Sequence, residues 1–525
     1  MSLGLFDVVG PIMHGPSSNH TGGANRIGYV AAKLIGGEAQ NYTFCFHPIF
    51  MKMFTGHRTH IALLAGCLGM REYEDACNDS KKIADEKGIR VTYRPIEDEE
   101  VDRNTMRILA ERDGIHWNIN GISVGGGNIL ITRINGIETH LDGNRWCYLF
   151  LLRAGSPIER ISNRLEEICP SAKRTYGTTA EGELLLLEAK TPFSASTLVS
   201  IDNVMGNYVF LRRSVEPMTL FPNCTENPPL FTTFEDFLSL CRTRPMIDVI
   251  YEYEITRSGR SREEILSQAM AIVDVIDSSM QRGRKGNNPL LCGYCSGSDG
   301  YMVEQWRQSG KSIVGDVFND AVAGALSMAE VSASAGRVVA VPTSGSAGGL
   351  PGALFATAKR FGSSREKLAE AFLVSAAVGV LAGNRCSFSG SIGGCQAEIG
   401  IGAGMGAAGA VYLADGSAEA ACHGFCFAIK ETLGLVCDPL AGPVEVPCIK
   451  RNAMGAVVAL MGAEMALAGV RSVVPPDQVL TALRDVQDRM PTELRGACVG
   501  GLAASPIAKE LQQMWATKLA AAGEI

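Results

Sequence analysis

The pattern of apolar residues changes near residue 231, and no other feature limits the possible folds as much. Before this point, short runs such as "VTYRPI" (91–96) and "GELLLLEA" (182–189) have the apolar and β-branched character of strands. After it, apolar residues recur at helical spacing in one segment after another. The sequence therefore predicts a multi-domain chain, with an α+β N-terminal part and a large, mainly helical C-terminal part.

Smaller changes of pattern divide the chain further. The run "WCYLFLL" (146–152) opens a second, smaller α+β unit, and a segment rich in proline and asparagine follows that unit. We expect a domain at 1–145, a small domain at 146–215, a linker at 216–230 and a helical domain at 231–525. Roughly three domains agree with the chain length at about 100–200 residues each.

Ser261 and Glu264 form a capping-box pattern inside the helical part. An apolar face follows it at helical spacing, on Ile265, Ala269, Ile272, Ile276 and Met280. This pattern predicts a helix that begins directly after Ser261.

Charge and cysteine content exclude several classes of protein. A net charge of −7 and a pI near 5.8 argue against nucleic acid or an anionic membrane as the main partner. The apolar run at 371–383 is shorter than the ~20 residues that a membrane span needs, and Glu464 interrupts the run at 454–470. Because no signal-peptide pattern precedes the 16 cysteines, we expect reduced thiols in a cytoplasmic protein.

The segment "GPSSNHTGGANRIG" (15–28) places consecutive polar residues directly before a predicted helix, whose apolar face is Ile27, Val30, Ala31 and Leu34. Free backbone N–H groups at a helix N-terminus favour a bound carboxylate or phosphate. An ordinary N-cap with polar neighbours is the alternative interpretation.

Two familiar motifs occur in unsuitable surroundings. "GAGMGAAG" (402–409) contains a GxGxxG pattern, but it lacks a clear preceding strand and the spaced acidic residue of a dinucleotide site, so close helix packing is the better interpretation. Cys292 and Cys295 form a CxxC without the βαβ pattern of a redox protein. Cys422 and Cys426 are one helical turn apart and fit core positions.

Three other cysteines, Cys395, Cys437 and Cys448, lie beside glycines or prolines. An irregular backbone at such places can direct several sulfur atoms to a common point. Their spacings of 42 and 11 residues fit neither a zinc finger nor a compact ferredoxin motif. From spacing alone, a shared metal site and independent buried thiols both remain open.

Six motifs that span nearly the whole chain carry a family resemblance. They are "GPSSNHTGGANRIG", "TGHRTH", "GISVGGGNI", "VPTSGSAGGLPG", "GGCQAEIG" and "LVCDPLAGPVEVPCIKRNA". Together they resemble the iron–sulfur-dependent L-serine dehydratases (L-serine ammonia-lyases), with the β and α parts fused in one chain. The resemblance implies a serine dehydratase β-like domain at 1–145, a degenerate ACT-like domain at 146–215 and an α-like, cluster-binding domain at 231–525.

The resemblance also assigns residues to an active site. It implies a [4Fe–4S] cluster on Cys395, Cys437 and Cys448, without pyridoxal phosphate, and His57 and His20 as catalytic residues. The substrate-binding candidates lie in the same motifs or in the glycine-rich loops nearby; they are Ser17, Ser18, Thr21, Thr59, Thr343, Ser344, Gly345, Ser389 and Asn452.

Serine dehydration requires removal of a weakly acidic α-proton and expulsion of hydroxide. A cluster of four irons on three thiolates leaves one iron open as a Lewis acid for the carboxylate and β-hydroxyl of L-serine. A neutral imidazole near pH 7 suits the proton abstraction, for which we select His57. The expected products are pyruvate and ammonia, which fits amino-acid degradation and gluconeogenesis, and we expect a cytoplasmic homodimer.

Some positions depart from the family pattern, namely Asn19, Arg58, His60 and the pair Arg385–Cys386. Because these positions surround the expected pocket, the resemblance predicts the type of reaction more firmly than the identity of the substrate. An iron–sulfur lyase that acts on L-cysteine or L-threonine is therefore one alternative.

Two further alternatives belong to other classes. A pyridoxal-phosphate dehydratase needs a Schiff-base lysine in a characteristic motif, which the surroundings of Lys33 and Lys52 lack. A non-catalytic amino-acid-sensing regulator could use the ACT-like unit, but the intact His57 and the three motif cysteines argue against it.

Overall fold

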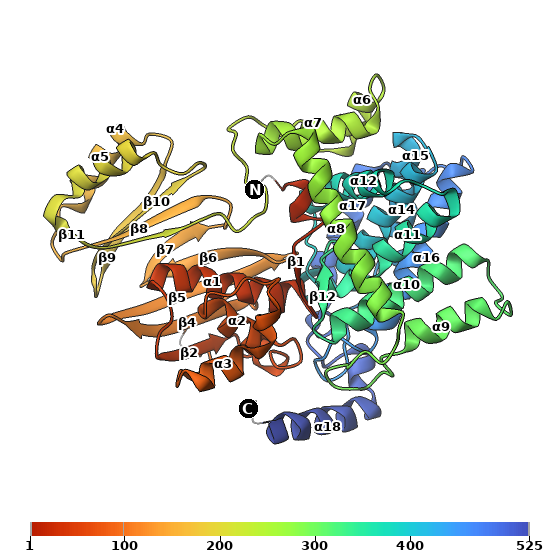
Figure 1. The fold of residues 1–525 in the computed structure, drawn as a ribbon, viewed down its shortest axis with the longest axis horizontal. Helices are drawn as coiled ribbons and strands as arrows, with labels where there is room; N and C mark the ends of the chain where they lie inside the picture. Colours follow the sequence, from red (N-terminus) through yellow and green to blue (C-terminus); the bar gives the residue numbers. More distant parts are fainter. Residues whose placement is uncertain (1–2, 98, 523–525) are drawn as a thin grey trace.

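The computed structural model describes residues 3–97 and 99–522 (Figure 1). In the N-terminal part, α1 (Ala24–Ile35) packs on one face of a six-stranded sheet, beside α2 (Thr59–Cys67) and α3 (Ser80–Glu86). The strand order is β3–β2–β4–β5–β6–β7, with β2 and β3 parallel and the other neighbours antiparallel. The strands are β2 (Asn41–Phe46), β3 (Arg90–Pro95), β4 (Thr105–Arg112), β5 (Ile115–Gly125), β6 (Asn128–Ile134) and β7 (Ile137–Leu141).

Glycines bring α1 and α2 into backbone contact. A Cβ atom at Gly28 would lie 2.3 Å from the Leu63 carbonyl oxygen, and one at Gly66 would lie 2.0 Å from the Asn25 carbonyl oxygen. Side chains at these positions would push the helices apart. The close packing holds the N-terminus of α2, just after His57, against the turn that precedes α1.

The small second unit has the element order βαββαβ, which is that of a ferredoxin-like fold. Its antiparallel sheet has the order β11–β8–β10–β9. The elements are β8 (Trp146–Leu152), α4 (Ile158–Ile168), β9 (Lys173–Thr179), β10 (Gly182–Ala189), α5 (Ala195–Met205) and β11 (Val209–Val215). That this unit is ACT-like stays a prediction.

Strands β8 and β10 of this unit are buried on both faces. Leu149 and Leu184 pack into the core of the N-terminal part, whereas Phe150 and Leu185 pack with the small unit's own helices. Burial on both faces explains why the sequence of β10 is a continuous apolar run instead of an alternating one.

The C-terminal part is helical, as the sequence predicts. Its helices are α6 (Phe234–Cys241), α7 (Met246–Ser258), α8 (Arg262–Gly283), α9 (Asp299–Gln308), α10 (Asp316–Ala333), α11 (Gly349–Phe361), α12 (Arg365–Gly383), α13 (Gly390–Gly393), α14 (Ile401–Leu413), α15 (Ala418–Thr432), α16 (Cys448–Leu467), α17 (Pro476–Arg489) and α18 (Pro506–Ala522). Ser261 caps α8 through a capping box with Glu264, which confirms the predicted start of that helix.

Helix α14 lies among α11, α12, α15 and α16 and carries the GxGxxG pattern. A Cβ atom at Gly404 would lie 2.7 Å from the Phe425 ring, and one at Gly409 would lie 2.4 Å from the Ser375 hydroxyl oxygen. The glycines thus permit close helix packing, which confirms the interpretation made from the sequence.

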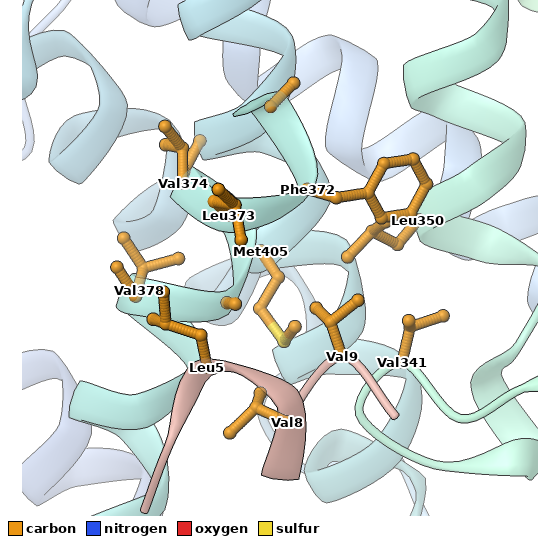
Figure 2. Packing of buried hydrophobic residues seen from close by; sticks show 14 of the residues in the cluster. Leu5, Val8, Val9, Val341, Leu350, Phe372, Leu373, Val374, Val378 and Met405 are labelled. Atoms are coloured by element: carbon orange, nitrogen blue, oxygen red, sulfur yellow. The ribbon is translucent and has the colours of Figure 1, made fainter. Parts of the chain in front are cut away.

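The segment at residues 5–9 packs within the helical part. Leu5, Val8 and Val9 lie in its hydrophobic core, next to Val378 of α12 and Met405 of α14 (Figure 2). The chain then forms β1 (Ile12–His14), which pairs antiparallel with β12 (Arg337–Val339). The strand pattern assigns residues 1–145 to one domain. In the structure, Leu5, Val8 and Val9 of that range belong to the hydrophobic core of the helical part.

Within residues 3–97 and 99–522, no helix combines the length and the apolar character that a membrane span requires.

Candidate active site

The polar loop at 17–23 is both a helix cap and a support for His57. Ser18–Gly23 form a π-helical turn that runs directly into α1, and the Ser17 hydroxyl accepts a hydrogen bond from the His20 backbone N–H at 3.1 Å. The Thr21 hydroxyl donates to the His57 carbonyl oxygen at 2.7 Å. Ser18 is buried within the same turn. The N-cap interpretation is therefore correct for Ser17, while Thr21 connects the loop to the second motif.

His57 is held in one tautomer. Its Nδ1 lies 3.1 Å from the Met53 carbonyl oxygen, and because a carbonyl only accepts, Nδ1 carries the proton. The Nε2 atom therefore keeps its lone pair in the neutral ring. Burial lowers the pKa of His57 to about 4, so the imidazole is neutral near pH 7. This is the state in which a histidine can act as a general base.

His20 lies against His57, with 4.7 Å between the ring centroids and an edge-to-face orientation. Its Nε2 atom is 3.4 Å from Asn104 Oδ1, so Nε2 carries the proton in this ring. Burial, and next the neighbouring His57, lower the pKa of His20 to about 3. Two neutral imidazoles with defined tautomers thus lie side by side.

The three motif cysteines converge in the helical part. Cys395 follows α13, Cys437 lies on the loop after α15, and Cys448 is the first residue of α16. The Sγ atoms of Cys395 and Cys437 lie within 4.8 Å of each other and of a carboxylate oxygen of Glu398. A hydrogen bond with Cys395, and then burial, raise the pKa of Cys437, while burial and the charge of Cys395 raise the pKa of Cys448. The three thiols are therefore electrostatic neighbours.

Arg451 brings a positive charge to these thiols. Its Nη1 atom is 3.6 Å from Cys395 Sγ, 2.8 Å from the Val436 carbonyl oxygen and 2.7 Å from a carboxylate oxygen of Asp438. A guanidinium in this position stabilises negative charge on the sulfur. Clustered thiols with a carboxylate and a cation beside them form a donor set that suits iron.

Glu398 also belongs to this site, and it is not among the residues that the sequence motifs predict there. The carboxylate accepts a hydrogen bond from the Thr343 hydroxyl at 3.0 Å, and burial raises the pKa of Glu398 to about 7. A Cβ atom at Gly345 would lie 3.2 Å from its Oε1, and one at Gly390 would lie 2.6 Å from its Oε2. Two glycines thus leave room for the carboxylate. The sequence signal was an acidic residue inside the "GGCQAEIG" motif.

Asn452 and Ser344 hold neighbouring backbone in place. The Asn452 side chain accepts from the Gly348 N–H at 2.8 Å and donates to the carbonyl oxygens of Gly345 at 2.8 Å and Cys448 at 3.0 Å. Ser344 Oγ lies 3.0 Å from Ser332 Oγ of α10. Because protein groups engage both side chains, we treat them as positioning residues for the loop at 343–349 and for the start of α16.

Thr59 differs from these residues because its buried hydroxyl has no hydrogen-bond partner among the described residues. A buried, unpaired hydroxyl is costly unless another group satisfies it. His60, which departs from the family pattern, packs its ring against Phe54 and Tyr93.

A hydrogen-bond chain connects the histidines to the cysteine loops across the two parts of the molecule. Asn19 Nδ2 donates to Ser389 Oγ at 2.7 Å, and Ser389 Oγ lies 2.8 Å from Ser391 Oγ. Ser391 Oγ then donates at 3.2 Å to Asn104 Oδ1, the same oxygen that faces His20. Asn19, which also departs from the family pattern, therefore forms part of the junction between the two parts.

Backbone contacts bring the same two motifs together. A Cβ atom at Gly56, next to His57, would lie 2.7 Å from the Pro443 nitrogen, on the loop between Cys437 and Cys448. The glycine turn between β5 and β6 also approaches the helical part, because a Cβ atom at Gly126 would lie 3.2 Å from the Pro342 carbonyl oxygen. The sites predicted on separate segments thus form one region at the junction.

The CxxC segment supports the cysteine loop from outside. The buried Glu445 carboxylate accepts backbone N–H bonds from Cys292 at 2.7 Å and Tyr294 at 2.8 Å. Cys422 and Cys426 are buried within α15, in the hydrophobic core of the helical part, which confirms the core assignment.

The fold and the site define an enzyme of two parts, in which an α+β part supplies histidines and a helical part supplies thiols. A family model described as serine dehydratase alpha chain matches residues 242–503. The chain is 38% identical over 286 residues to the probable L-serine dehydratase, alpha chain, of Bacillus subtilis (strain 168), covering 54% of this chain and 95% of that protein. It is 36% identical over 290 residues to the L-serine dehydratase, alpha chain, of Peptoniphilus asaccharolyticus, covering 54% and 98%.

The N-terminal part has relatives of its own. The chain is 39% identical over 140 residues to the probable L-serine dehydratase, beta chain, of Bacillus subtilis (strain 168), covering 27% of this chain and 64% of that protein. The chain belongs to the L-serine dehydratase family, with regions similar to the alpha and beta chains joined in one polypeptide.

Proposed function

We propose that this protein deaminates L-serine to pyruvate and ammonia by α,β-elimination of water, at the junction of its two parts. The observation that carries the proposal is the backbone contact between Gly56 and Pro443, which brings the loop of a neutral, tautomerically fixed His57 against the loop between Cys437 and Cys448. The relatives named as L-serine dehydratases support the choice of substrate.

A [4Fe–4S] cluster fits the residues of the site. Cys395, Cys437 and Cys448 would hold it as thiolates, and Arg451 would offset part of their charge. When bound, the cluster would supply a Lewis-acidic iron for the carboxylate and β-hydroxyl of the substrate. The raised pKa values of Cys437 and Cys448 favour their neutral thiols, whereas a bound metal would hold them as thiolates and would explain why the sulfur atoms are gathered at one point.

His57 would remove the α-proton of L-serine through Nε2, while Nδ1 keeps its own proton and donates it in a hydrogen bond to the Met53 carbonyl oxygen. The electron pair of the broken Cα–H bond forms the Cα=Cβ bond, and the Cβ–O bond breaks with departure of hydroxide, which takes up the proton that His57 has removed and leaves as water. The aminoacrylate then tautomerises to an imine, which water hydrolyses to pyruvate and ammonia. The enclosed site keeps both imidazoles neutral for this purpose.

The groups around His57 would bind and orient the substrate. His20 and the hydroxyls of Ser17, Ser18 and Thr21 would form the wall that faces the carboxylate, as the resemblance implies. The unpaired Thr59 hydroxyl is a further group available to a ligand. L-cysteine and L-threonine remain the alternative substrates, because Arg58 and His60 depart from the family pattern beside this wall.

The test is anaerobic purification, analysis of iron and sulfide, and a pyruvate assay with L-serine. We expect about four irons and four sulfides per chain and pyruvate formation without added pyridoxal phosphate. Ser substitutions at Cys395, Cys437 or Cys448 should each abolish cluster retention. The matched controls Cys422→Ser and Cys426→Ser should retain it, because these thiols lie in the core. An active protein without iron would contradict the proposal.

A further inference from the structure

A substrate such as L-serine carries a positive ammonium group as well as its carboxylate and hydroxyl. The two site imidazoles are neutral and the surrounding hydroxyls carry no charge, so neither can neutralise an ammonium group. A buried ammonium without a counter-charge is strongly unfavourable. An amino-acid site in this enclosed region therefore calls for a carboxylate.

The described loops that carry the thiols contain three carboxylates near the site. Asp438 is engaged by the Arg451 guanidinium and by the Leu502 backbone N–H at 2.9 Å. Glu445 is engaged by the backbone N–H groups of the CxxC segment. Both are already neutralised or satisfied by protein groups, so neither is available to a ligand.

Glu398 is the third carboxylate, and its environment is different. Among the described residues, its hydrogen-bond partner is the uncharged Thr343 hydroxyl at 3.0 Å, and no cationic side chain pairs with it. The side chain is half-buried, so part of it remains accessible within the site. Gly345 and Gly390 lie close to its two oxygens, because Cβ atoms there would be 3.2 Å from Oε1 and 2.6 Å from Oε2, so the absence of side chains at both positions leaves room for the carboxylate.

We propose that the Glu398 carboxylate binds the α-ammonium group of the substrate and thereby selects α-amino acids over acids that lack the amino group. The assignment rests on the proposed function, because it places the substrate between His57 and the thiols. The carboxylate oxygen lies within 4.8 Å of the Sγ atoms of Cys395 and Cys437, so a substrate held there is next to the metal-binding groups. Thr343 orients the carboxylate by donating to one oxygen, which leaves the other for the ligand.

The test compares two ligands that differ only in the ammonium group. L-alanine and propionate both lack a leaving group, so neither turns over. Their dissociation constants are measured by calorimetric titration of the anaerobically purified, iron-loaded chain. The variants are Glu398→Gln, which keeps the shape of the side chain, Glu398→Asp as the conservative variant, and Glu431→Gln as a control that removes an exposed negative charge. Iron content is determined for every sample.

We expect Glu398→Gln to weaken L-alanine binding by roughly tenfold to a hundredfold, the usual effect of losing a hydrogen bond between charged groups. Propionate binding and iron content should stay within twofold of the unmodified protein. Glu398→Asp should recover part of the L-alanine affinity, and Glu431→Gln should change neither constant.

Other outcomes would overturn the assignment. Equal weakening of both ligands would make Glu398 a residue that shapes the pocket, and loss of iron in Glu398→Gln would make it a metal ligand. If the unmodified, iron-loaded chain binds neither ligand and makes no pyruvate from L-serine, the proposed function itself fails. If that chain makes pyruvate but discriminates little between L-alanine and propionate, the ammonium assignment alone fails.

Discussion

The hydrogen bond from His57 Nδ1 to the Met53 carbonyl decides which nitrogen of the ring faces the reaction. The backbone of the same residue is also held, because the His57 N–H donates to the Met53 carbonyl oxygen at 3.1 Å and the Thr21 hydroxyl donates to the His57 carbonyl oxygen at 2.7 Å. A histidine held in this way loses little freedom when it takes up a proton. At the residue scale, the surrounding hydrogen bonds therefore fix the position of the Nε2 atom.

Replacement of His57 by alanine should lower kcat by roughly 10²–10⁴, the usual contribution of a positioned general base. Iron content should not change, because His57 has no contact with the thiols among the interactions of the described residues. His20→Ala should instead raise KM at least as much as it lowers kcat, since its proposed contact is with the carboxylate. Steady-state kinetics with iron analysis measures both. Near-normal kcat in His57→Ala, together with an inactive His20→Ala, would contradict this assignment and would make His20 the general base.

Single residues also show how far the sequence could predict the site. Motifs predict the cysteines and His57, because a thiol in a motif indicates metal binding and an imidazole indicates proton transfer. Asn104 and Ser391 carried no such signal, since they matter only through contacts that packing creates across 287 positions of the chain. Glu398 lay inside a recognised motif, yet its unpaired state depends on where Arg451 and Asp438 point. The ACT-like character, the homodimer and the cytoplasmic location stay predictions.

At the scale of elements, the loop that carries His57 and the loop that carries the thiols meet through backbone at Gly56 and Pro443. Gly56→Ala would place a methyl group 2.7 Å from the Pro443 nitrogen, which backbone cannot avoid without moving. We expect a loss of activity of about 100-fold, because a displacement near 1 Å in a catalytic group can cost that much. The measurement is kcat/KM with L-serine.

Gly315→Ala is the matched control for this substitution. Its Cβ atom would meet nothing within 4 Å, and the backbone φ of −65° accepts alanine. This variant should keep the activity of the unmodified protein. Full activity in Gly56→Ala would show that the two loops tolerate separation.

The contact between the two sheets should make stability depend on pH through Glu188 of β10. Burial raises the pKa of Glu188 to about 7, above its ordinary value of 4.5. A carboxyl group whose folded-state pKa is raised contributes stability below pH 4.5, and this contribution is lost as pH rises toward 7 and above. Glu188→Gln, which cannot ionise, should therefore be more stable than the unmodified protein at pH 8 by about 1–3 kcal/mol, with little difference at pH 4.5.

Thermal unfolding of both proteins at the two pH values measures this difference. Glu159→Gln, at an exposed position on α4, is the control and should show no pH-dependent difference. An equal difference in Tm at both pH values would contradict the assignment to ionisation.

At the scale of the whole molecule, the two parts are joined by more than the linker at 216–230. Leu5, Val8 and Val9 are buried in the helical core, and β1 pairs with β12. A chain cleaved at a protease site inserted between Glu226 and Asn227 should therefore elute as one species in gel filtration and keep its activity. The same cleavage in a Leu5→Asp variant should release the N-terminal fragment, because a charge at this buried position opposes docking. Separation of the fragments in both proteins would contradict this view.

The architecture was predictable where periodicity is long and regular, as in α8 and in the division between strands and helices. The docking of residues 5–9 was not, because a few apolar residues carry no periodicity and their partners lie on α12 and α14, hundreds of positions away. Sequence patterns describe which face of an element is apolar, but they do not say which distant surface covers it.

The burial of the N-terminal segment also has a consequence for synthesis on the ribosome. Val8 leaves the ribosome before Met405, which lies beside it in the core and is about 400 residues later in the chain. At about 5–20 residues per second, this interval lasts roughly 20–80 s. During that time the α+β part can fold, but its apolar N-terminal segment lacks its partner on α14 and part of it is exposed to other contacts. The slow step in folding should therefore be the late insertion of this segment into the helical core. The reason is that the residues that come into contact are separated by a very long stretch of sequence.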